Sequence, residues 1–235
     1  MPATVKIRFM KKTFLFIGIV IFTVSVQAQV AEKFFVFLNT NPDRAELPEA
    51  EVNEIHAAHR ANMDSLAEAK RLLAAGPFHG GGGIQVVVAT SAEDANELVL
   101  TDPAVETARF HTEIFPLSME VGGICPVQEP YEMVEYQFIR YVPVKEAIEA
   151  EKPKKLEKYL KRHINYIKAN FYKRKLIANG DFGPGMGGFV VAFKEQEDDF
   201  DDFIKYDPYI RSGLYTADTR ILWIAQGTFC ERKPE

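Results

Sequence analysis

The sequence predicts an α+β protein made of two copies of one β-α-β-β-α-β unit. Two observations predict this class: a set of residues recurs in the same order, and each copy alternates strand-like and helix-like hydrophobic patterns. The chain has 235 residues, of which 47% are hydrophobic and 26% charged. This composition supplies enough apolar surface for a folded core and excludes disordered and low-complexity classes.

The repeat is the strongest signal in the chain. His59 and Gly76 are 17 residues apart, and so are His163 and Gly180. The other matched pairs are Asp102-Pro103 with Asp207-Pro208, Phe110 with Tyr215, Gly122 with Gly227, and Cys125 with Cys230. This order predicts a tandem duplication, with one module over residues 29–125, a second over 131–230, and a linker over 126–130.

Each copy opens with a strand and a long helix. Residues 34–38 and 134–141 are rich in aromatic and β-branched side chains, which is typical of strands. Helices are expected over about 48–70 and 153–173, with Pro48 and Pro153 in the first turn, where no amide donor is lost. Their apolar stripes are Val52, Ile55, His59, Met63 and Leu66, and Leu156, Leu160, His163, Ile167 and Phe171. Each histidine is therefore expected on a helix face that packs against a sheet.

The remaining elements follow in the same order in both copies. Short strands are expected over 72–76 and 176–182, and further strands over 84–89 and 189–193. A second helix begins at Ser91, where Ser91 and Asp94 have capping-box spacing, and its counterpart covers about 198–206. Closing strands are expected over 110–117 and 214–225. The resulting unit has ferredoxin-like topology.

The N-terminus predicts a secretory signal peptide over residues 1–28. Basic residues up to Lys12 precede an apolar run over 14–24, and the small-residue exit Val26-Gln27-Ala28 follows. An uncleaved signal anchor is the weaker alternative, since spanning a bilayer takes about 20 apolar residues. We therefore expect a secreted or periplasmic protein with no stable membrane span after cleavage.

The charge argues against a nucleic-acid partner. The formal net charge is -5, and removal of the four basic side chains in residues 1–28 takes it to -9. Binding to phosphates requires a surplus of Lys and Arg on at least one face.

Two motifs that suggest cofactor or metal sites have simpler explanations. Residues 183–188 match G-x-G-x-x-G, but a strand and not a helix is expected to follow, so the run is interpreted as a turn. The acidic run over 195–202 lacks the glycine of a calcium loop and is interpreted as the start of a helix. We expect no cofactor and no metal site.

The two cysteines leave two alternatives open. Cys125 and Cys230 occupy matching positions, so they could face each other in a pseudo-symmetric pair, and export permits oxidation. Two separate, half-buried thiols are the slightly favoured interpretation. A Cα separation above about 7 Å would exclude a bridge.

The ordered motifs resemble the YciI-like (YCII-related) family in both copies. The first copy has HRANMDSLAEAKRLLAAGPF from His59, and the second has HINYIKANFYKRKLIANGDF from His163. The resemblance implies a dimeric α/β-barrel arrangement, here formed within one chain as an intramolecular pair. It also implies a His–Asp active-site pair, carried over to His59 with Asp102 and His163 with Asp207. Asp181 stands where the first copy has Pro77, so the two copies are not equivalent.

Two function classes follow from these residues. The first is a cofactor-independent lyase or isomerase that acts on a small molecule, with a histidine as general acid or base and an aspartate that orients it. The second is a non-catalytic periplasmic small-ligand-binding or structural protein, in which each histidine is a packed core residue. A polar pocket at the histidine would favour the first class, and a filled barrel would favour the second.

Overall fold

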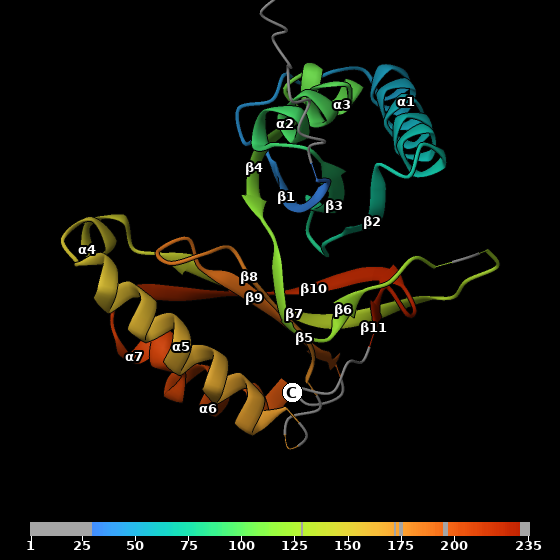
Figure 1. Ribbon diagram of the computed structural model, residues 1–235. Helices are drawn as coiled ribbons and strands as arrows, with labels where there is room; N and C mark the ends of the chain where they lie inside the picture. The colour runs from blue at the N-terminus through green and yellow to red at the C-terminus, as the bar shows by residue number, and fades with distance from the viewer. Residues whose placement is uncertain (1–29, 128, 172, 174–175, 195–196, 231–235) are drawn as a thin grey trace, which may run out of the picture.

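The computed structural model describes residues 30–127, 129–171, 173, 176–194 and 197–230. These residues form a mixed α+β fold with two large antiparallel sheets, which lie face to face between helices on either side (Figure 1). The predicted α+β class is confirmed. The predicted signal peptide lies outside the described residues. Within them, no helix is long and apolar enough to cross a membrane.

The first sheet has the strand order β2-β3-β1-β4. Its strands are β1 (Glu32–Thr40), β2 (Leu72–Pro77), β3 (Gly83–Ala89) and β4 (Phe110–Pro116), and its helices are α1 (Glu49–Glu68), α2 (Ala92–Leu100) and α3 (Pro103–Glu106). The buried members of its outer core are Phe34, Val36, Leu38, Val87, Ala89, Ala95 and Val99, from β1, β3 and α2. Thus α2 covers the outer face of this sheet.

The second sheet has the strand order β10-β7-β9-β8-β5. Its first four strands correspond to β4, β1, β3 and β2 of the first sheet, and β5 is added beside β8. Its strands are β7 (Met133–Pro143), β8 (Leu176–Asp181), β9 (Gly188–Phe193), β10 (Tyr215–Ala225) and β5 (Ser118–Val121). Its helices are α4 (Lys145–Glu149), α5 (Pro153–Asn170), α6 (Glu197–Tyr206) and α7 (Pro208–Arg211). The loop over 182–187 joins β8 directly to β9, so the expected strand–turn–strand arrangement around the glycine motif is observed.

The two sheets are joined along both edges. On one side β4 runs from the first sheet to the second and continues as β5 (Figure 1). On the other side Phe78, after β2, pairs with Leu222 of β10. The repeated glycines lie at these junctions: a Cβ on Gly76 would approach the Trp223 carbonyl oxygen to 2.6 Å, and one on Gly180 would overlap the Phe189 ring. Only glycine allows this close approach.

Aromatic side chains fill the space between the sheets. Phe35 of β1 lies 4.6 Å from Phe189 of β9 between ring centroids, and Phe138 of β7 lies 5.1 Å from the same ring. All three side chains are fully buried and belong to one core cluster drawn from both sheets. The two halves are therefore held together by a shared hydrophobic core.

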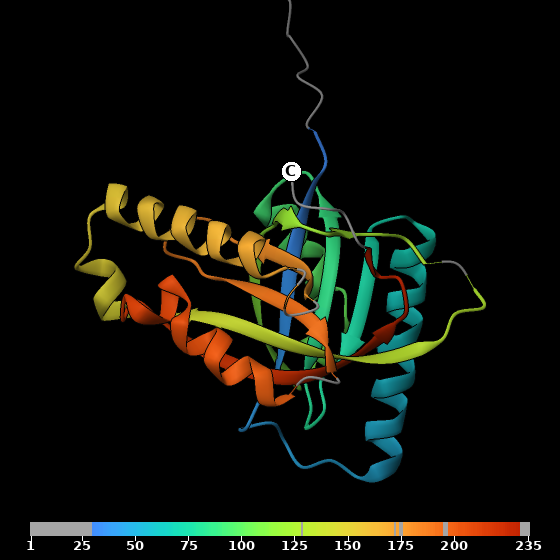
Figure 2. The ribbon, with the colours of Figure 1, turned by 90° about the horizontal axis from the view of Figure 1, so that it is seen from below.

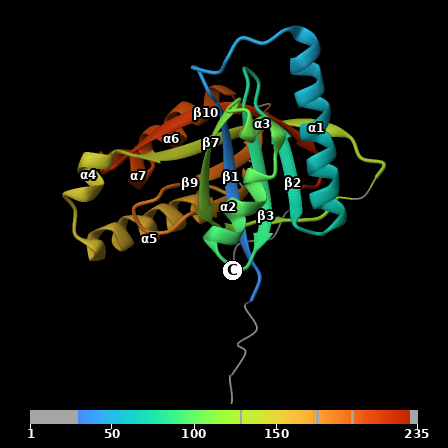
Figure 3. The same cartoon turned by 90° about the horizontal axis from the view of Figure 1, so that it is seen from above.

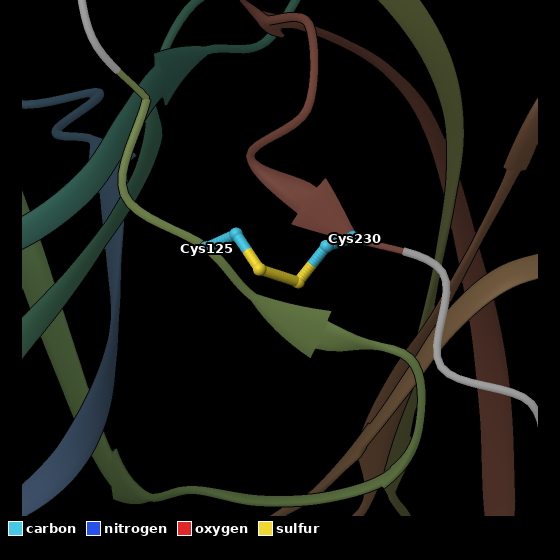
Figure 4. The surroundings of a disulfide bond; sticks show 2 residues. All are labelled: Cys125 and Cys230. Atoms are coloured by element: carbon cyan, nitrogen blue, oxygen red, sulfur yellow. A yellow bond between two sulfur atoms is a disulfide. The ribbon is translucent and has the colours of Figure 1, made fainter.

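A disulfide ties the tails of the two halves together. Cys125 and Cys230 are bonded with their Cα atoms 5.7 Å apart (Figure 4). Cys125 directly follows β6 (Gly123–Ile124), and Cys230 is the last residue of β11 (Phe229–Cys230), which pairs with β6 as a two-stranded ribbon. The favoured expectation of two separate thiols was wrong, because the pairing of β6 with β11 brings both cysteines into bonding range.

The long helices of the two halves pack differently. In α5, Leu156, His163 and Ile167 are buried as the stripe predicts, and α5 lies against the second sheet (Figure 2). In α1 no residue is buried, and the helix runs alongside β2 at the sheet edge with contacts to α3 (Figure 3). The expectation that His59 faces a sheet is therefore corrected: α1 leans against α3 and the edge strand.

Candidate functional site

The first His–Asp pair joins α1 to the loop between α2 and α3. His59 Nδ1 lies 2.6 Å from Asp102 Oδ2. The aspartate side chain is 2% exposed and the imidazole 18% exposed, so the histidine reaches solvent while its partner does not. The expected proximity of the two side chains is observed, and a catalytic role for them stays a prediction.

Backbone geometry fixes the position of Asp102. Its Oδ1 accepts a hydrogen bond from the Ala104 amide at 2.9 Å, as the N-cap of α3, and Pro103 occupies the first helical position. In the structure α2 ends at Leu100 and Asp102 begins a new helix, which leaves its second oxygen for His59.

The second pair has the same geometry but is buried. His163 Nδ1 lies 2.9 Å from Asp207 Oδ1, and the two side chains are 1% and 0% exposed. Asp207 caps α7 by accepting from the Tyr209 amide at 2.8 Å, and it also accepts from the Tyr141 hydroxyl at 2.9 Å. These donors hold the carboxylate inside the layer between the second sheet and its helices.

The aspartates select one tautomer of each imidazole. A carboxylate only accepts hydrogen bonds, so Nδ1 of His59 and of His163 is the donor and Nε2 is left with its lone pair when the ring is neutral. His163 Nε2 is buried and has no hydrogen-bond partner among the described residues. A free Nε2 that solvent can reach is what a general base needs. Of the two rings, only that of His59 combines this tautomer with exposure.

Aromatic rings enclose His163. Its ring stacks on Tyr209 with centroids 4.1 Å apart, and Tyr141 meets it edge-on at 4.7 Å. Tyr209 in turn stacks on Tyr215 at 4.0 Å. Burial raises the pKa of Tyr141 well above its usual range, and the pKa of Tyr209 is raised for the same main reason. Both hydroxyls are therefore neutral donors at physiological pH.

The second half carries polar side chains where the first half has apolar ones. The equivalent positions, matched by strand register and by the Asp-Pro pairs, are Leu38 with Tyr141, Ala75 with Asn179, Pro77 with Asp181, Ala104 with Tyr209, and Phe110 with Tyr215. Sequence reasoning singled out only Asp181 and missed the three tyrosines. The repeat offset was the signal that could have found them, since it aligns Phe110 with Tyr215.

Metal ligation has no candidate in the described part of the chain. No group of three or more His, Cys, Asp or Glu side chains is placed there to hold an ion. The acidic side chains at 195–199, for which a calcium role was considered and set aside, lie outside the described side chains.

Comparison with solved structures shows the type of fold. The chain is similar to a mutant chlorite dismutase from Candidatus Nitrospira defluvii with a TM-score of 0.50 and 10% identity, over 83% of this chain and 91% of that one. A putative monooxygenase from Lactobacillus acidophilus NCFM matches with a TM-score of 0.41 and 15% identity, over 83% and 96% of the two chains. At such identities the likeness concerns the fold alone. No curated protein matches the sequence.

Comparison with family models covers the first half. The match is to the model of the YCII-related domain and extends from β1 through the start of β5. It includes His59 on α1 and Asp102 at the start of α3, whereas the second half lies outside it. Residues 33–118 are thus similar to the YCII-related domain.

Proposed function

We propose that this chain is a small-molecule enzyme of the lyase or isomerase type, in which His59 transfers protons without a cofactor. The observation that carries the proposal is the His59–Asp102 pair: Nδ1 is held at 2.6 Å by a buried carboxylate, while 18% of the imidazole is exposed. Asp102 fixes the orientation and tautomer of the ring, so Nε2 can take a proton from a bound molecule and return it elsewhere.

The second half supports a tandem origin for the protein. Both sheets order their first four strands alike, and both histidines meet an aspartate that caps a short helix. We infer two ferredoxin-like modules, over residues 29–125 and 131–230, paired within one chain as an α/β barrel. In this arrangement His163 and Asp207 are the closed counterpart of the working pair and act mainly in packing.

We further propose that the protein is exported. The basic and apolar pattern of residues 1–28 supports this address, and the Cys125–Cys230 bridge suits an oxidising compartment. Mass spectrometry of the protein recovered from a secreting host tests it. A mature N-terminus at Gln29 is the expected result, and a retained leader would contradict it.

A non-catalytic small-ligand-binding or structural protein is the second candidate, and the packing between the sheets favours it. The space between the sheets holds phenylalanine side chains such as Phe35 and Phe138, which belong to one buried cluster drawn from both sheets. The His–Asp pairs lie outside that core, on the helical side of each sheet, and the proposed chemistry takes place there.

Exchange of carbon-bound protons in D2O tests the proposal with simple compounds in place of a natural substrate. The mature protein is incubated with a panel of small ketones, hydroxy acids and cyclic acids, and loss of C–H signals is followed by proton NMR. We expect enzyme-dependent exchange with at least one compound and its loss in H59Q. Exchange in H59Q at the wild-type rate, or none with any compound, would overturn the proposal.

The variant D102N tests the role of the carboxylate. Asparagine keeps an oxygen for the Ala104 amide but places an NH2 group toward His59, so the helix cap survives while the tautomer of the imidazole reverses. Loss of about a thousand-fold or more in exchange rate with an unchanged melting temperature is the expected result. An unchanged rate would show that Asp102 serves only as a cap.

A further inference from the structure

A cleft lies where the two halves meet, away from the filled barrel interior. It has a volume of about 390 Å³, within the range of about 300–1,000 Å³ that is usual for small-molecule sites. The start of β1, the β4–β5 junction and the end of β8 all contribute to it. We call it the seam cleft; the residues that matter here are Glu32, Lys33, Pro116, Leu117, Asp181 and Phe182.

Asp181 is the unusual residue of this cleft. It is a buried carboxyl group at the end of β8, at the position that Pro77 takes in the first half. Its Oδ1 accepts the Gly183 amide at 2.8 Å, and the Tyr209 hydroxyl donates to Oδ2 over a long 3.4 Å. Burial of a carboxyl group is costly unless the group is hydrogen-bonded or paired, and Asp181 has one short and one long hydrogen bond.

The surroundings of Asp181 favour its neutral form. Burial raises its pKa, the charge of Glu120 adds to this, and the Gly183 amide, His163 and the Tyr209 hydroxyl lower it by less. A protonated carboxyl group is a hydrogen-bond donor. In that protonated form, Asp181 can donate a hydrogen bond into the cleft from the β8 side.

The β1 side of the cleft carries two charged side chains. Lys33, an exposed residue at the start of β1, brings an ammonium group, and among the described residues it takes part in no ion pair. Glu32 beside it carries a negative charge, which would repel a second negative group on a ligand. Pro116, Leu117 and Phe182 give the cleft an apolar wall.

We propose that the seam cleft binds a small monoanionic carboxylate with an apolar or aromatic body. The ligand's carboxylate pairs with Lys33 and accepts a hydrogen bond from the protonated carboxyl group of Asp181, and its body packs on Pro116, Leu117 and Phe182. Two carboxyl groups that share one proton form a charge-assisted hydrogen bond. The site is distinct from the His59–Asp102 pair and uses residues from both halves.

Benzoate is a suitable probe, with phthalate and benzamide as matched dianionic and neutral controls. In an NMR titration of the full mature chain, we expect saturable shifts of the Gly183 and Lys33 amides with benzoate at millimolar concentration, because Gly183 donates to Asp181. Phthalate and benzamide should bind at least about five-fold more weakly. Absence of saturation by benzoate, or equal binding of all three, would overturn the proposal.

Two variants test the individual contacts. K33Q should weaken benzoate binding by about five-fold. In the wild type the affinity should fall about ten-fold or more as pH rises and Asp181 ionises, whereas D181N should bind with little dependence on pH. Glu120, His163 and Tyr209 also act on this carboxyl group, and they are unchanged in D181N, as is Glu32, which lines the same cleft. Equal pH dependence in the two proteins would overturn the role of Asp181. If D181N does not fold, the shifts of the Gly183 and Lys33 amides in the wild type show whether benzoate binds in the seam cleft.

The seam-cleft proposal can be tested separately from the acid–base function. H59Q leaves the seam cleft intact and is expected to bind benzoate as the wild type does. Unchanged binding together with lost exchange would separate the two sites. Loss of benzoate binding in folded H59Q would show that the ligand sits at the histidine and would overturn the seam cleft.

Discussion

Opening the Cys125–Cys230 bridge should cost the protein much of its stability. The bond closes a loop with a sequence separation of 105 residues, and the chain-entropy model gives about 4.8 kcal/mol for a loop of that size. For a domain of this length such a loss corresponds to a fall of about 10–20 °C in melting temperature. The bridge has this effect on stability because it restrains the ends of both halves in the unfolded chain.

Thermal unfolding followed by circular dichroism, with and without reductant, measures this effect. The double variant Cys125→Ser/Cys230→Ser is the matched control: it should melt near the reduced wild type and ignore reductant. Mass spectrometry after alkylation verifies that reduction is complete. A fully reduced wild type that melts with the oxidised one would refute the reasoning, because it would show that the shared core alone holds the halves together.

Three further predictions concern stability. S91A removes the oxygen that accepts the Asp94 amide at 3.1 Å and should lower the free energy of unfolding by about 1 kcal/mol in urea titrations. Y141F removes a buried donor from Asp207 and should cost about 1–3 kcal/mol by the same measurement. The Thr90 amide, with help from a guanidinium, lowers the pKa of Asp94 from 3.8 to about 2. Because the folded-state pKa is depressed, this contribution is present above about pH 4 and is lost as pH falls toward 2; D94N should flatten that part of the pH profile.

Exposed residues of the same types serve as controls. S65A, in the exposed face of α1, and Y206F, with 53% of the side chain exposed, should leave the free energy of unfolding unchanged. Equal effects of S91A and S65A would contradict the capping argument. Equal effects of Y141F and Y206F on the free energy of unfolding would show that Asp207 does not depend on Tyr141. If D94N has the same stability between about pH 4 and pH 2 as the wild type, the Asp94 carboxylate does not contribute to acid stability.

Local sequence signals predicted the main elements well. Pro153 marks the first turn of α5, and the Ser91 cap of α2 is present as expected. Short apolar runs located β3 and β9 to within one residue of each end. These signals act within a few residues of the chain, so the sequence alone is sufficient to interpret them.

Elements that depend on distant partners were missed. β5 exists because it pairs with β8 across the seam, and the β6–β11 ribbon joins segments far apart in the chain. Their own sequences carry little strand pattern. The disulfide expectation failed for the same reason, since only the ribbon brings Cys125 and Cys230 together.

The candidate site was predictable in its pairs and not in its surroundings. The family resemblance implied that His59 belongs with Asp102 and His163 with Asp207, and the geometry brings both pairs within hydrogen-bond distance. The stripes of α1 and α5 look alike in sequence, yet one helix stands at a sheet edge and the other is packed. Exposure of one histidine and burial of the other is a tertiary property that periodicity does not encode. Tyr209 likewise has the pattern of an ordinary core aromatic.

Comparing proton exchange between the two histidine variants tests the central claim most directly. On a compound that the wild type exchanges in D2O, the rate per folded molecule is measured for H59Q and for H163Q. The account predicts that H59Q loses exchange, whereas folded H163Q retains it. Exchange that survives in H59Q and disappears in folded H163Q would contradict the account, since it would place the proton-transferring group in the buried pair.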